Sequence, residues 1–362
     1  MADISVHANN DVDQWCKDLQ VEYVRAMQLR KLMGKSENMP IQVKRELATL
    51  PGRDIYITLI KRLTGAGVTG DNTLMGNEEA LGNFAHRITV DQIRNAVRRG
   101  RFEQKKTHFD LLKAGRTALK NWAMAKLRDD IIEALYSANV DGSTAYASCT
   151  EAQKDAWVDA NSDRVQFGAL RSNLSTSAPA GGATYDHSDS LASNVDATND
   201  KLTYSLVSLA ARLAERADPH IRPINVSEKG EMYVMLCGSY PSRDLKTNMA
   251  TLLQNADVRG DGNKLWSNGD LMYENVLIKK IPEIPVVAGV GAGSINVGAN
   301  FLMGAQAVGV AIGEDLHSIN HTDDYGNLKG AGVAEIRGVD KMTQNDVDHG
   351  LVTVWTAAVS DS

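Results

Sequence analysis

The positions of the apolar residues predict one helix of unusual length, over residues 103–138. Its apolar side chains recur at multiples of four: Leu111, Leu119, Ala123, Leu127, Ile131 and Leu135. Residues at that spacing share one face of a helix, so this face is expected to be buried. At about 1.5 Å per residue, about 35 residues form a rod of about 50 Å, whereas the mean helix has about 11–12 residues. We expect four side chains to anchor this helix in the core: Leu119, Trp122, Leu127 and Ile131.

An alternation of apolar and polar residues predicts a β-hairpin further towards the N-terminus. Residues 54–62 are rich in β-branched and aromatic side chains, with apolar odd positions, which is typical of a strand. Residues 86–93 have the same character and are the candidate antiparallel partner. The stretch between them is polar, rich in glycine and without hydrophobic period. Because structureless connections longer than about 12–15 residues are uncommon in compact domains and are often functional, we expect this loop to reach over a neighbouring copy of the chain.

The remaining segments combine both patterns. Helices are predicted at residues 10–34, 200–217 and 297–313, and a further helix begins near Pro241. Strands are predicted at residues 231–237, in two pieces across 276–288, and at 334–338 and 351–359. Residues 139–200 are dominated by Ser, Thr, Ala, Asp, Asn and Gly. Such a composition favours a surface region with little core, and we expect a transition between domains there.

The composition narrows the class of protein. Hydrophobic residues make up 43% of the 362 residues, enough to bury a core, while aromatic residues make up only 6%. The net charge of −6 is not that of a nucleic-acid-binding protein, which usually has a basic face and a high isoelectric point. The three cysteines lie far apart and predict neither a disulfide framework nor a zinc site. No signal peptide or membrane span is predicted, so we expect the protein to be made and assembled in cytoplasm.

Candidate chemical motifs are weak. The GVGAG run at 289–293 lacks the spacing of a dinucleotide-binding loop, and a loop near a subunit contact is expected instead. His317 and His321 are four residues apart, but Ser318 stands where a zinc protease has glutamate. The DVRGDGN run at 257–263 departs from a calcium loop and is expected to be a turn. We find no nucleophile elbow or phosphate loop, and we predict no catalytic residue, no metal and no cofactor.

One cluster of basic residues follows the hairpin: Arg94, Arg98, Arg99, Arg101, Lys105 and Lys106. It has two interpretations, a solvated corner between a strand and a helix, or one half of a contact between copies. In the second interpretation the other half is the set of acidic residues in the long loop, Asp71, Glu78 and Glu79. Charge complementarity of this kind sets register more than it adds affinity.

Several segments of the amino-acid sequence resemble those of a known protein family. The stretch RLTGAGVTGDNTLMGNEEAL within residues 62–81 is the most specific part, and YVMLCGSYPSRDLKT and FLMGAQAVGVAIG also match. These segments resemble the major capsid proteins of tailed phages, which share the HK97-like fold. The resemblance covers most of the chain and is weakest over residues 139–200.

The resemblance implies an α+β fold with a long spine helix and an extended β-hairpin loop. It implies an N-terminal arm at 1–52, an extended loop at 53–98, a peripheral domain at 99–138 with 331–362, and an axial domain at 139–330. It further implies a structural protein, not an enzyme, that self-assembles into hexamers and pentamers of an icosahedral head enclosing double-stranded DNA. The expected location is the virion, after assembly in the host cytoplasm.

The partners implied are other copies of the chain and, outside it, a separate scaffolding protein, a portal protein and decoration proteins. Packaged DNA is expected to be contacted only non-specifically, and no membrane is involved. For the basic cluster, contact with this DNA is the alternative to contact with the acidic loop. The alternative is an encapsulin-like shell protein of a bacterial cargo compartment, which has the same fold but encloses protein cargo.

Overall fold

The computed structural model describes residues 28–48, 52–60, 63, 65–107, 110–226, 230–248, 266–267 and 270–361. The chain divides into two compact units. The smaller unit includes Gln92–Leu127 and Asp315–Ile336, and the larger comprises Gln28–Asp91, Arg128–Glu314 and Arg337–Ser362. Helix α2 and strands β14 and β15 begin in one unit and end in the other.

A nine-stranded sheet forms the centre of the larger unit, in the order β6-β18-β13-β8-β11-β10-β9, with β12 beside β13 and β7 beside β8. Its strands are β6 (Val165–Phe167), β7 (Ile224–Val226), β8 (Gly230–Cys237), β9 (Trp266–Ser267), β10 (Asp270–Tyr273), β11 (Val276–Lys280), β12 (Val286–Val287), β13 (Val297–Met303) and β18 (Leu351–Ala357). Every residue of β13 and β18 is buried, because both strands lie inside the sheet and are covered on both faces.

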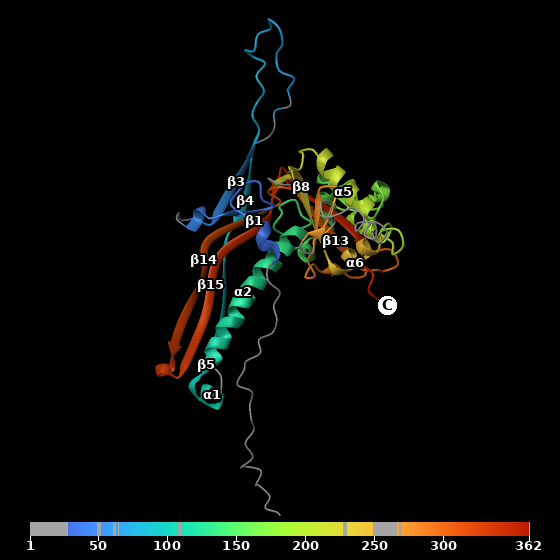
Figure 1. Cartoon of the computed structure of the whole chain (residues 1–362). Coiled ribbons are helices and arrows are strands. Elements are labelled where there is room, and N and C mark those ends of the chain that lie inside the picture. Colours follow the sequence, from blue (N-terminus) through green and yellow to red (C-terminus); the bar gives the residue numbers. More distant parts are fainter. Residues whose placement is uncertain are drawn as a thin grey trace, which may run out of the picture. The chain divides into compact units, whose positions relative to one another are not determined.

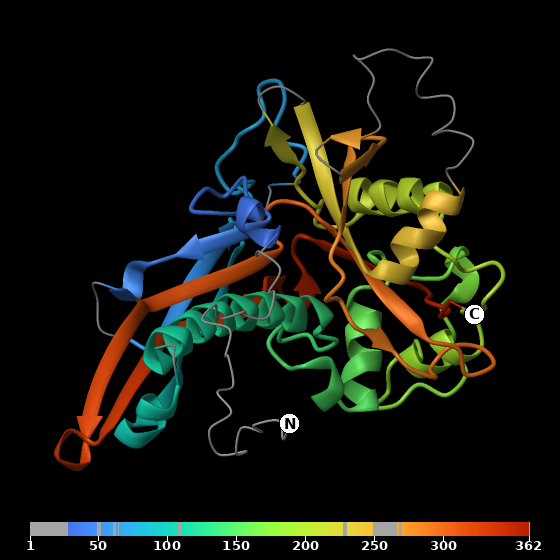
Figure 2. The same cartoon turned by 60° about the horizontal axis from the view of Figure 1, so that its bottom comes forward.

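Two helices cover this sheet, α5 (Tyr204–Arg216) and α6 (Ser239–Asn248), which lie side by side in Figure 2. Helix α5 begins at Thr203, whose side chain accepts a hydrogen bond from the N–H of Leu206. Its apolar face, including Leu206 and Ala210, packs in one cluster with Leu245 of α6 and with β8, β11, β13 and β18. The predicted helix at 200–217 and the predicted strands at 231–237 and 351–359 are therefore confirmed.

The predicted hairpin is also confirmed, except that its second strand ends at Thr89, and residues 91–93 belong to the next strand, β5 (Asp91–Gly100), in another sheet. Strands β3 (Asp54–Ile60) and β4 (Asn83–Thr89) pair antiparallel, from Asp54 opposite Thr89 to Ile60 opposite Asn83. The odd positions of β3 are buried and the even positions Tyr56, Thr58 and Ile60 are exposed, as the alternation requires. The loop between the strands projects beyond their ends (Figure 1).

The second sheet has the order β1-β2-β14-β15-β5. Its strands are β1 (Met33–Gly34), β2 (Ile41–Lys44), β5 (Asp91–Gly100), β14 (Val308–Asp323) and β15 (Leu328–Lys341), and β14 and β15 run side by side in Figure 1. Helices α1 (Arg101–Lys106) and α2 (Leu111–Tyr136) follow β5. Helix α2 lies close to β5, because a Cβ on Gly115 would lie only 2.5 Å from Cγ2 of Val97. A larger residue at position 115 would therefore displace the side chain of Val97 or move the helix away from β5.

The single rod predicted over residues 103–138 is wrong in one respect. Helix α1 ends at Lys106, Thr107 is extended, and α2 begins at Leu111. Asp110 accepts hydrogen bonds from the N–H groups of Leu112 and Lys113, so it caps a new helix instead of continuing the first. The long helix itself spans 26 residues.

The helix predicted at 297–313 is wrong, because this segment forms strand β13 and the beginning of β14. A continuous run of small and apolar residues fits a buried helix and a buried strand equally well. Here its glycines allow close contact between strands and neighbouring backbone. A Cβ on Gly304, for example, would lie 2.5 Å from the carbonyl oxygen of Arg222.

The expectation that residues 139–200 contribute little core is also wrong. The region contains α3 (Glu151–Ala160), β6 and α4 (His187–Ala192), and it buries Trp157, Phe167 and Leu191 almost completely. Polar side chains hold its loops together. Buried Asp155, for example, accepts hydrogen bonds of 2.7 Å from the N–H groups of Ala180 and His187.

The other predicted elements have mixed outcomes. The two strands within 276–288 exist, but β11 pairs with β8 and β10, and β12 pairs with β13. The predicted strand at 334–338 lies within β15, and α6 begins at Ser239. The predicted helix at 10–34 lies outside the described residues up to residue 27, and Gln28–Leu32 is a short 3-10 helix. The turn expected at 257–263 lies outside the described residues.

The structure also contains short elements between the main helices and strands. Strands β16 (Thr343–Gln344) and β17 (Val347–Asp348) form a small antiparallel pair. Further 3-10 turns occupy Glu46–Ala48, Tyr146–Ser148, Arg171–Asn173 and Asp324–Gly326.

Candidate assembly surfaces

The loop of the β3–β4 hairpin, residues 63 and 65–82, is almost entirely exposed. It carries large apolar side chains on its surface: Leu63 (55% exposed), Leu74 (62%), Met75 (83%) and Leu81 (62%). Gly67, Gly70 and Gly76 adopt positive φ angles, which allow the chain to turn without a compact core. Exposed apolar clusters of this kind mark surfaces that contact another molecule.

The acidic residues of this loop, Asp71, Glu78 and Glu79, are exposed as well. Glu79 accepts a hydrogen bond of 2.6 Å from the N–H of Gly65 on the opposite arm of the loop. Glu78 accepts one of 2.7 Å from the N–H of Gly76. These carboxylates therefore shape the loop from within, a role that the sequence did not reveal.

The residues of the basic cluster lie on both faces of strand β5 and on helix α1. Arg94 and Arg98 are exposed on one face, and Arg99 is half-buried on the other face together with Val97. Arg101, Lys105 and Lys106 are exposed on α1. Lys106 pairs with Glu103 at 2.9 Å and lies 4.3 Å from the centre of the exposed Phe102 ring.

The N-terminus of α2 beside this cluster holds a negative charge. The backbone N–H groups of Lys113 and Leu112 lower the pKa of Asp110, and Arg99 and Arg116 lower it further. Asp110 therefore remains ionised beside the basic cluster at neutral pH.

The four helix positions expected in the core are buried to different degrees. Leu119 is 3% exposed and Ile131 is fully buried, whereas Trp122 and Leu127 are only partly buried. Leu119, Trp122 and Leu127 lie in the part of α2 that belongs to the smaller unit, and Ile131 lies in the larger unit.

We expect Trp122→Ala to lower the yield of folded protein, and Lys120→Ala to leave it unchanged. Truncating a buried tryptophan costs about 3–5 kcal/mol, and the partial exposure of Trp122 places the expected loss at the lower end of this range. Lys120 is exposed on the same helix and is the matched control. Chemical denaturation of both variants measures the difference, and equal stabilities would mean that Trp122 contributes nothing to anchoring the helix.

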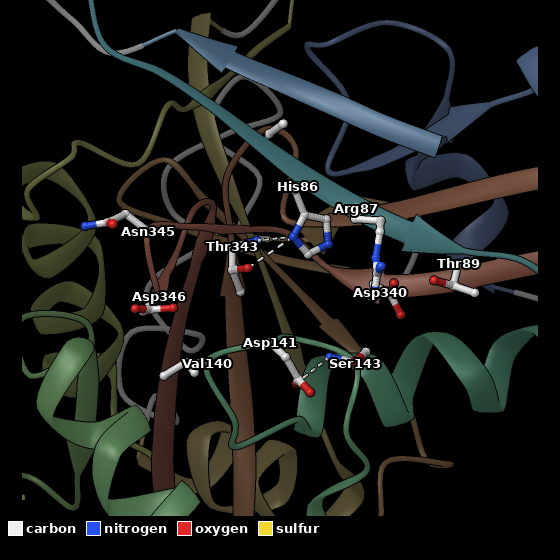
Figure 3. A pocket seen from close by; sticks show the side chains of 11 residues that line it. His86, Arg87, Thr89, Val140, Asp141, Ser143, Asp340, Thr343, Asn345 and Asp346 are labelled. Atoms are coloured by element: carbon white, nitrogen blue, oxygen red, sulfur yellow. Dashed lines mark hydrogen bonds between the residues drawn. The ribbon is translucent and has the colours of Figure 1, made fainter. Parts of the chain in front are cut away.

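A polar cavity of about 570 Å³ lies at the base of the hairpin, within the larger unit (Figure 3). His86 and Arg87 of β4, Asp141 of the loop after α2, and Asp340 of β15 line it, and Nδ1 of His86 lies 3.1 Å from the hydroxyl of Thr343. Burial lowers the pKa of His86 to about 4. Burial, and then the charge of Asp141, raises the pKa of Asp340 to about 7, against the opposite effect of Arg87. No sequence pattern indicates this cavity, because its lining comes from three distant segments, at 85–89, 140–143 and 340–346.

The weak chemical motifs of the sequence do not form sites in the described part of the chain. His317 and His321 lie on strand β14, where residues four apart are separated by about 13 Å. The GVGAG run leads into strand β13 and not into a helix. Within the described ranges, no three His, Cys, Asp or Glu side chains are placed to hold a metal ion. The helices that the structure describes include none long and apolar enough to cross a membrane.

Two buried histidines, His86 and His187, and the partly buried His349 make the stability of the larger unit dependent on pH. Burial lowers the pKa of His86 to about 4, of His187 to about 3 and of His349 to about 4. The unfolded chain binds protons at these sites below about pH 6.5, whereas the folded chain does not. The part of the stability that depends on neutral histidine is therefore fully present above about pH 6.5 and is lost as the pH falls towards 4. A shift of one pKa unit corresponds to about 1.4 kcal/mol, so the combined effect of the three histidines outweighs the opposite effect of the single group Asp340.

We expect the free energy of unfolding of the isolated subunit to fall by several kcal/mol between pH 7 and pH 4.5. Denaturant titrations at a series of pH values measure this slope. The variant His187→Gln is expected to have a shallower slope than the parent chain. The same slope in both proteins would contradict the assignment of the pH dependence to buried histidine.

An exposed hairpin loop, a long helix beside a sheet, and a second sheet with a buried centre together define a class: shell subunits with the HK97-like capsid fold. The comparisons with known proteins agree. A family model described as "Phage capsid protein" matches residues 3–360, so the chain belongs to the phage capsid protein family. This family is a structural one, and the chain is a subunit of a phage capsid shell.

Individual relatives support the same assignment. The major capsid protein of Pseudomonas phage KPP25 is 28% identical over 357 residues, covering 91% of this chain and 90% of that protein. The solved capsid asymmetric unit of cyanophage Pam1 is 31% identical, with a TM-score of 0.88 and 100% coverage of both chains. The capsid of Ralstonia phage GP4 is 23% identical, with a TM-score of 0.75, covering 99% of this chain and 100% of that one, and it shows the fold alone. The α+β fold expected from the sequence is therefore confirmed.

Proposed function

We propose that this chain is the major shell subunit of a tailed-phage head, and that it self-assembles into hexamers and pentamers of an icosahedral shell around double-stranded DNA. The observation that carries the proposal is the hairpin loop, whose apolar side chains, Met75 above all, are exposed in the single chain. A surface of this kind gains stability only when another molecule covers it. Assembly takes place in the host cytoplasm, and the finished shell is part of the virion.

The proposal assigns each surface a partner. The loop packs on a neighbouring copy, where its acidic residues approach the basic cluster. The acidic residues are Asp71, Glu78 and Glu79, and the basic ones are Arg94, Arg98, Arg99 and Arg101. A separate scaffolding protein, a portal protein and decoration proteins complete the particle. The net charge of −6 supports only non-specific contact with the packaged DNA.

The proposed domain division follows the same family resemblance: an arm at 1–52, an extended loop at 53–98, a peripheral domain at 99–138 with 331–362, and an axial domain at 139–330. Strand β18 pairs with β13 and β6. The chain after residue 350 therefore joins a sheet whose other strands come from the segment proposed as axial.

Electron microscopy and sedimentation velocity of the purified full-length chain test this proposal. Closed shells built of five- and six-membered rings are expected at high protein concentration, or on co-expression with a scaffolding protein. Shells that purify with a packaged protein in place of DNA would favour the encapsulin-like cargo compartment. A chain that remains monomeric under both conditions would contradict the proposal.

A further inference from the structure

The polar cavity at the base of the hairpin contains more negative than positive charge. Three carboxylates line it, those of Asp141, Asp340 and Asp346, together with one cation, Arg87. The ring of His86 adds no charge at neutral pH, because burial lowers its pKa to about 4. The charge of the cavity therefore favours a cation as its ligand.

Asp340 is a buried carboxylate without a hydrogen bond or an ion pair from the described part of the chain. Its residue is only 9% exposed. The adjacent Lys341 points to the opposite face of the strand, where its Nζ donates to Asp348 and to the carbonyl oxygen of Ser137. By contrast, buried Asp155 accepts two hydrogen bonds from backbone N–H groups. Because burying a carboxylate without a partner is costly, Asp340 indicates a group that arrives from outside the chain.

The chain itself holds the walls of this cavity in place. The N–H of Lys341 donates a hydrogen bond of 3.0 Å to the carbonyl oxygen of Gly142, which keeps the loop after α2 beside β15. Nδ1 of His86 lies 3.1 Å from the hydroxyl of Thr343, which links β4 to β16. Asp346 lies in the tight turn between β16 and β17. Figure 3 shows side chains of these three segments around the cavity, so the site is formed before a ligand binds.

The lining residues suit an organic cation better than a metal ion. Within the described ranges, no three His, Cys, Asp or Glu side chains are placed to hold a metal ion. An organic cation instead brings its own hydrogen-bond donors to the carboxylates. The guanidinium group is planar, has five N–H donors and is less strongly hydrated than an ammonium group, which makes it the better partner for a carboxylate as buried as that of Asp340.

We propose that this cavity receives a guanidinium group, supplied by an arginine side chain of a second copy of the chain, which pairs with Asp340. The inference rests on the proposed function and adds a contact at the base of the hairpin. Asp141 and Asp346 outweigh the repulsion between Arg87 and the incoming cation. Once two copies lie side by side, an arginine of the neighbour is present at a far higher effective concentration than a free cation.

The pairing depends on the charge of Asp340. Burial, and then the charge of Asp141, raises the pKa of Asp340 to about 7, which Arg87 opposes. Burial also acts to raise the pKa of Asp141, but hydrogen bonds within its loop lower it below the ordinary value. His86 is neutral above its pKa of about 4. Asp340 is therefore the facing group that titrates near neutral pH, and the affinity for a cation is expected to fall about tenfold between pH 8 and pH 6.

Arginine amide is the probe for the site in isolated full-length subunits. Calorimetric titration is expected to show saturable binding, weakened at least tenfold by Asp340→Asn and about tenfold by a change from pH 8 to pH 6. Glu133→Gln removes an exposed carboxylate outside the cavity and is the matched control, expected to bind as the parent chain does. Equal binding by Asp340→Asn and the parent chain, or no binding by the parent chain, would overturn the proposal.

The unsubstituted chain provides a measurement that does not depend on how a variant folds. The titration of the Asp340 carboxyl group is followed by NMR with and without arginine amide. The midpoint is expected to shift to lower pH when the probe is present, because a bound cation favours the ionised form. An unchanged midpoint would remove Asp340 from the site and overturn the proposal.

Assembly distinguishes an arginine of a second copy from a free cation. Asp340→Asn is expected to reduce the assembled fraction at pH 8, measured by sedimentation, at least fivefold, and shells of the parent chain are expected to bind no arginine amide. Normal assembly of the variant, or shells that bind as much probe per subunit as isolated subunits do, would overturn the second copy as the donor. If the parent chain forms no shells, the proposed function fails together with that donor, whereas binding of arginine amide to subunits still decides the site.

Discussion

Deleting residues 66–80 is expected to give a folded subunit that forms no shells. The loop of the hairpin buries almost nothing in its own chain, and its hydrogen bonds from Gly65 and Gly76 are local. Its loss therefore removes little stability from the monomer. The same deletion removes Leu74 and Met75, the most exposed apolar side chains of the tip, and with them the surface that we propose to pack on a neighbouring copy.

Circular dichroism and thermal unfolding test the fold of the deletion variant, and electron microscopy tests its assembly. A graded version replaces only Leu74 and Met75 by Asp and is expected to weaken assembly in the same direction. The matched control, Asn72→Ser with Thr73→Ser, changes exposed polar residues of the same loop and is expected to assemble normally. Normal shells from the deletion variant would remove the hairpin loop from the assembly mechanism.

Lys341→Ala is expected to destabilise the larger unit by about 3–5 kcal/mol, because it leaves a buried carboxylate without its charge partner. Lys341 and Asp348 are buried almost completely, and Nζ of Lys341 lies 2.9 Å from Oδ2 of Asp348. The same oxygen accepts a hydrogen bond of 3.1 Å from Nε1 of Trp157, and Lys341 donates one of 2.6 Å to the carbonyl oxygen of Ser137. The pair thus connects α3, β15 and β17 with Ser137, the residue that follows α2.

Denaturant unfolding of the variant measures this effect. Lys113→Ala, at an exposed position, is the control and is expected to change the free energy of unfolding by less than about 0.5 kcal/mol. Replacing both partners, Lys341→Met with Asp348→Leu, is expected to recover much of the loss, since no buried charge then remains. Equal stability of Lys341→Ala and the parent chain would show that the buried charge of Asp348 is compensated elsewhere.

The sequence predicted the elements whose pattern is local. The apolar residues Ile55, Ile57 and Leu59 alternate with polar or exposed ones and define strand β3. Apolar residues at every fourth position from Leu119 to Ile131 define the buried face of α2. The polar, glycine-rich segment between β3 and β4 likewise predicted a long loop. In these segments the side chains that decide the structure lie within one period of each other.

The sequence did not predict features that depend on distant residues. The segment from Val297 to Met303 forms a strand because it pairs with β8 and β18 on either side. The local sequence of the segment does not reveal this pairing. The cavity around His86 is assembled from segments far apart in the chain. Lys341 and Asp348 lie close in sequence, but their other partners, Ser137 and Trp157, come from distant segments. Polar side chains such as Asp155 bury themselves by bonding backbone N–H groups, so a polar composition over 139–200 did not exclude a core.

A cryo-electron-microscopy reconstruction of the particle formed by the full-length chain tests the central claim most directly. The account predicts a closed shell of hexamers and pentamers, in which the hairpin loop of every copy, with Leu74 and Met75 buried, lies against a neighbouring copy. A particle in which this loop folds back on its own chain, or remains surrounded by solvent, would contradict the account.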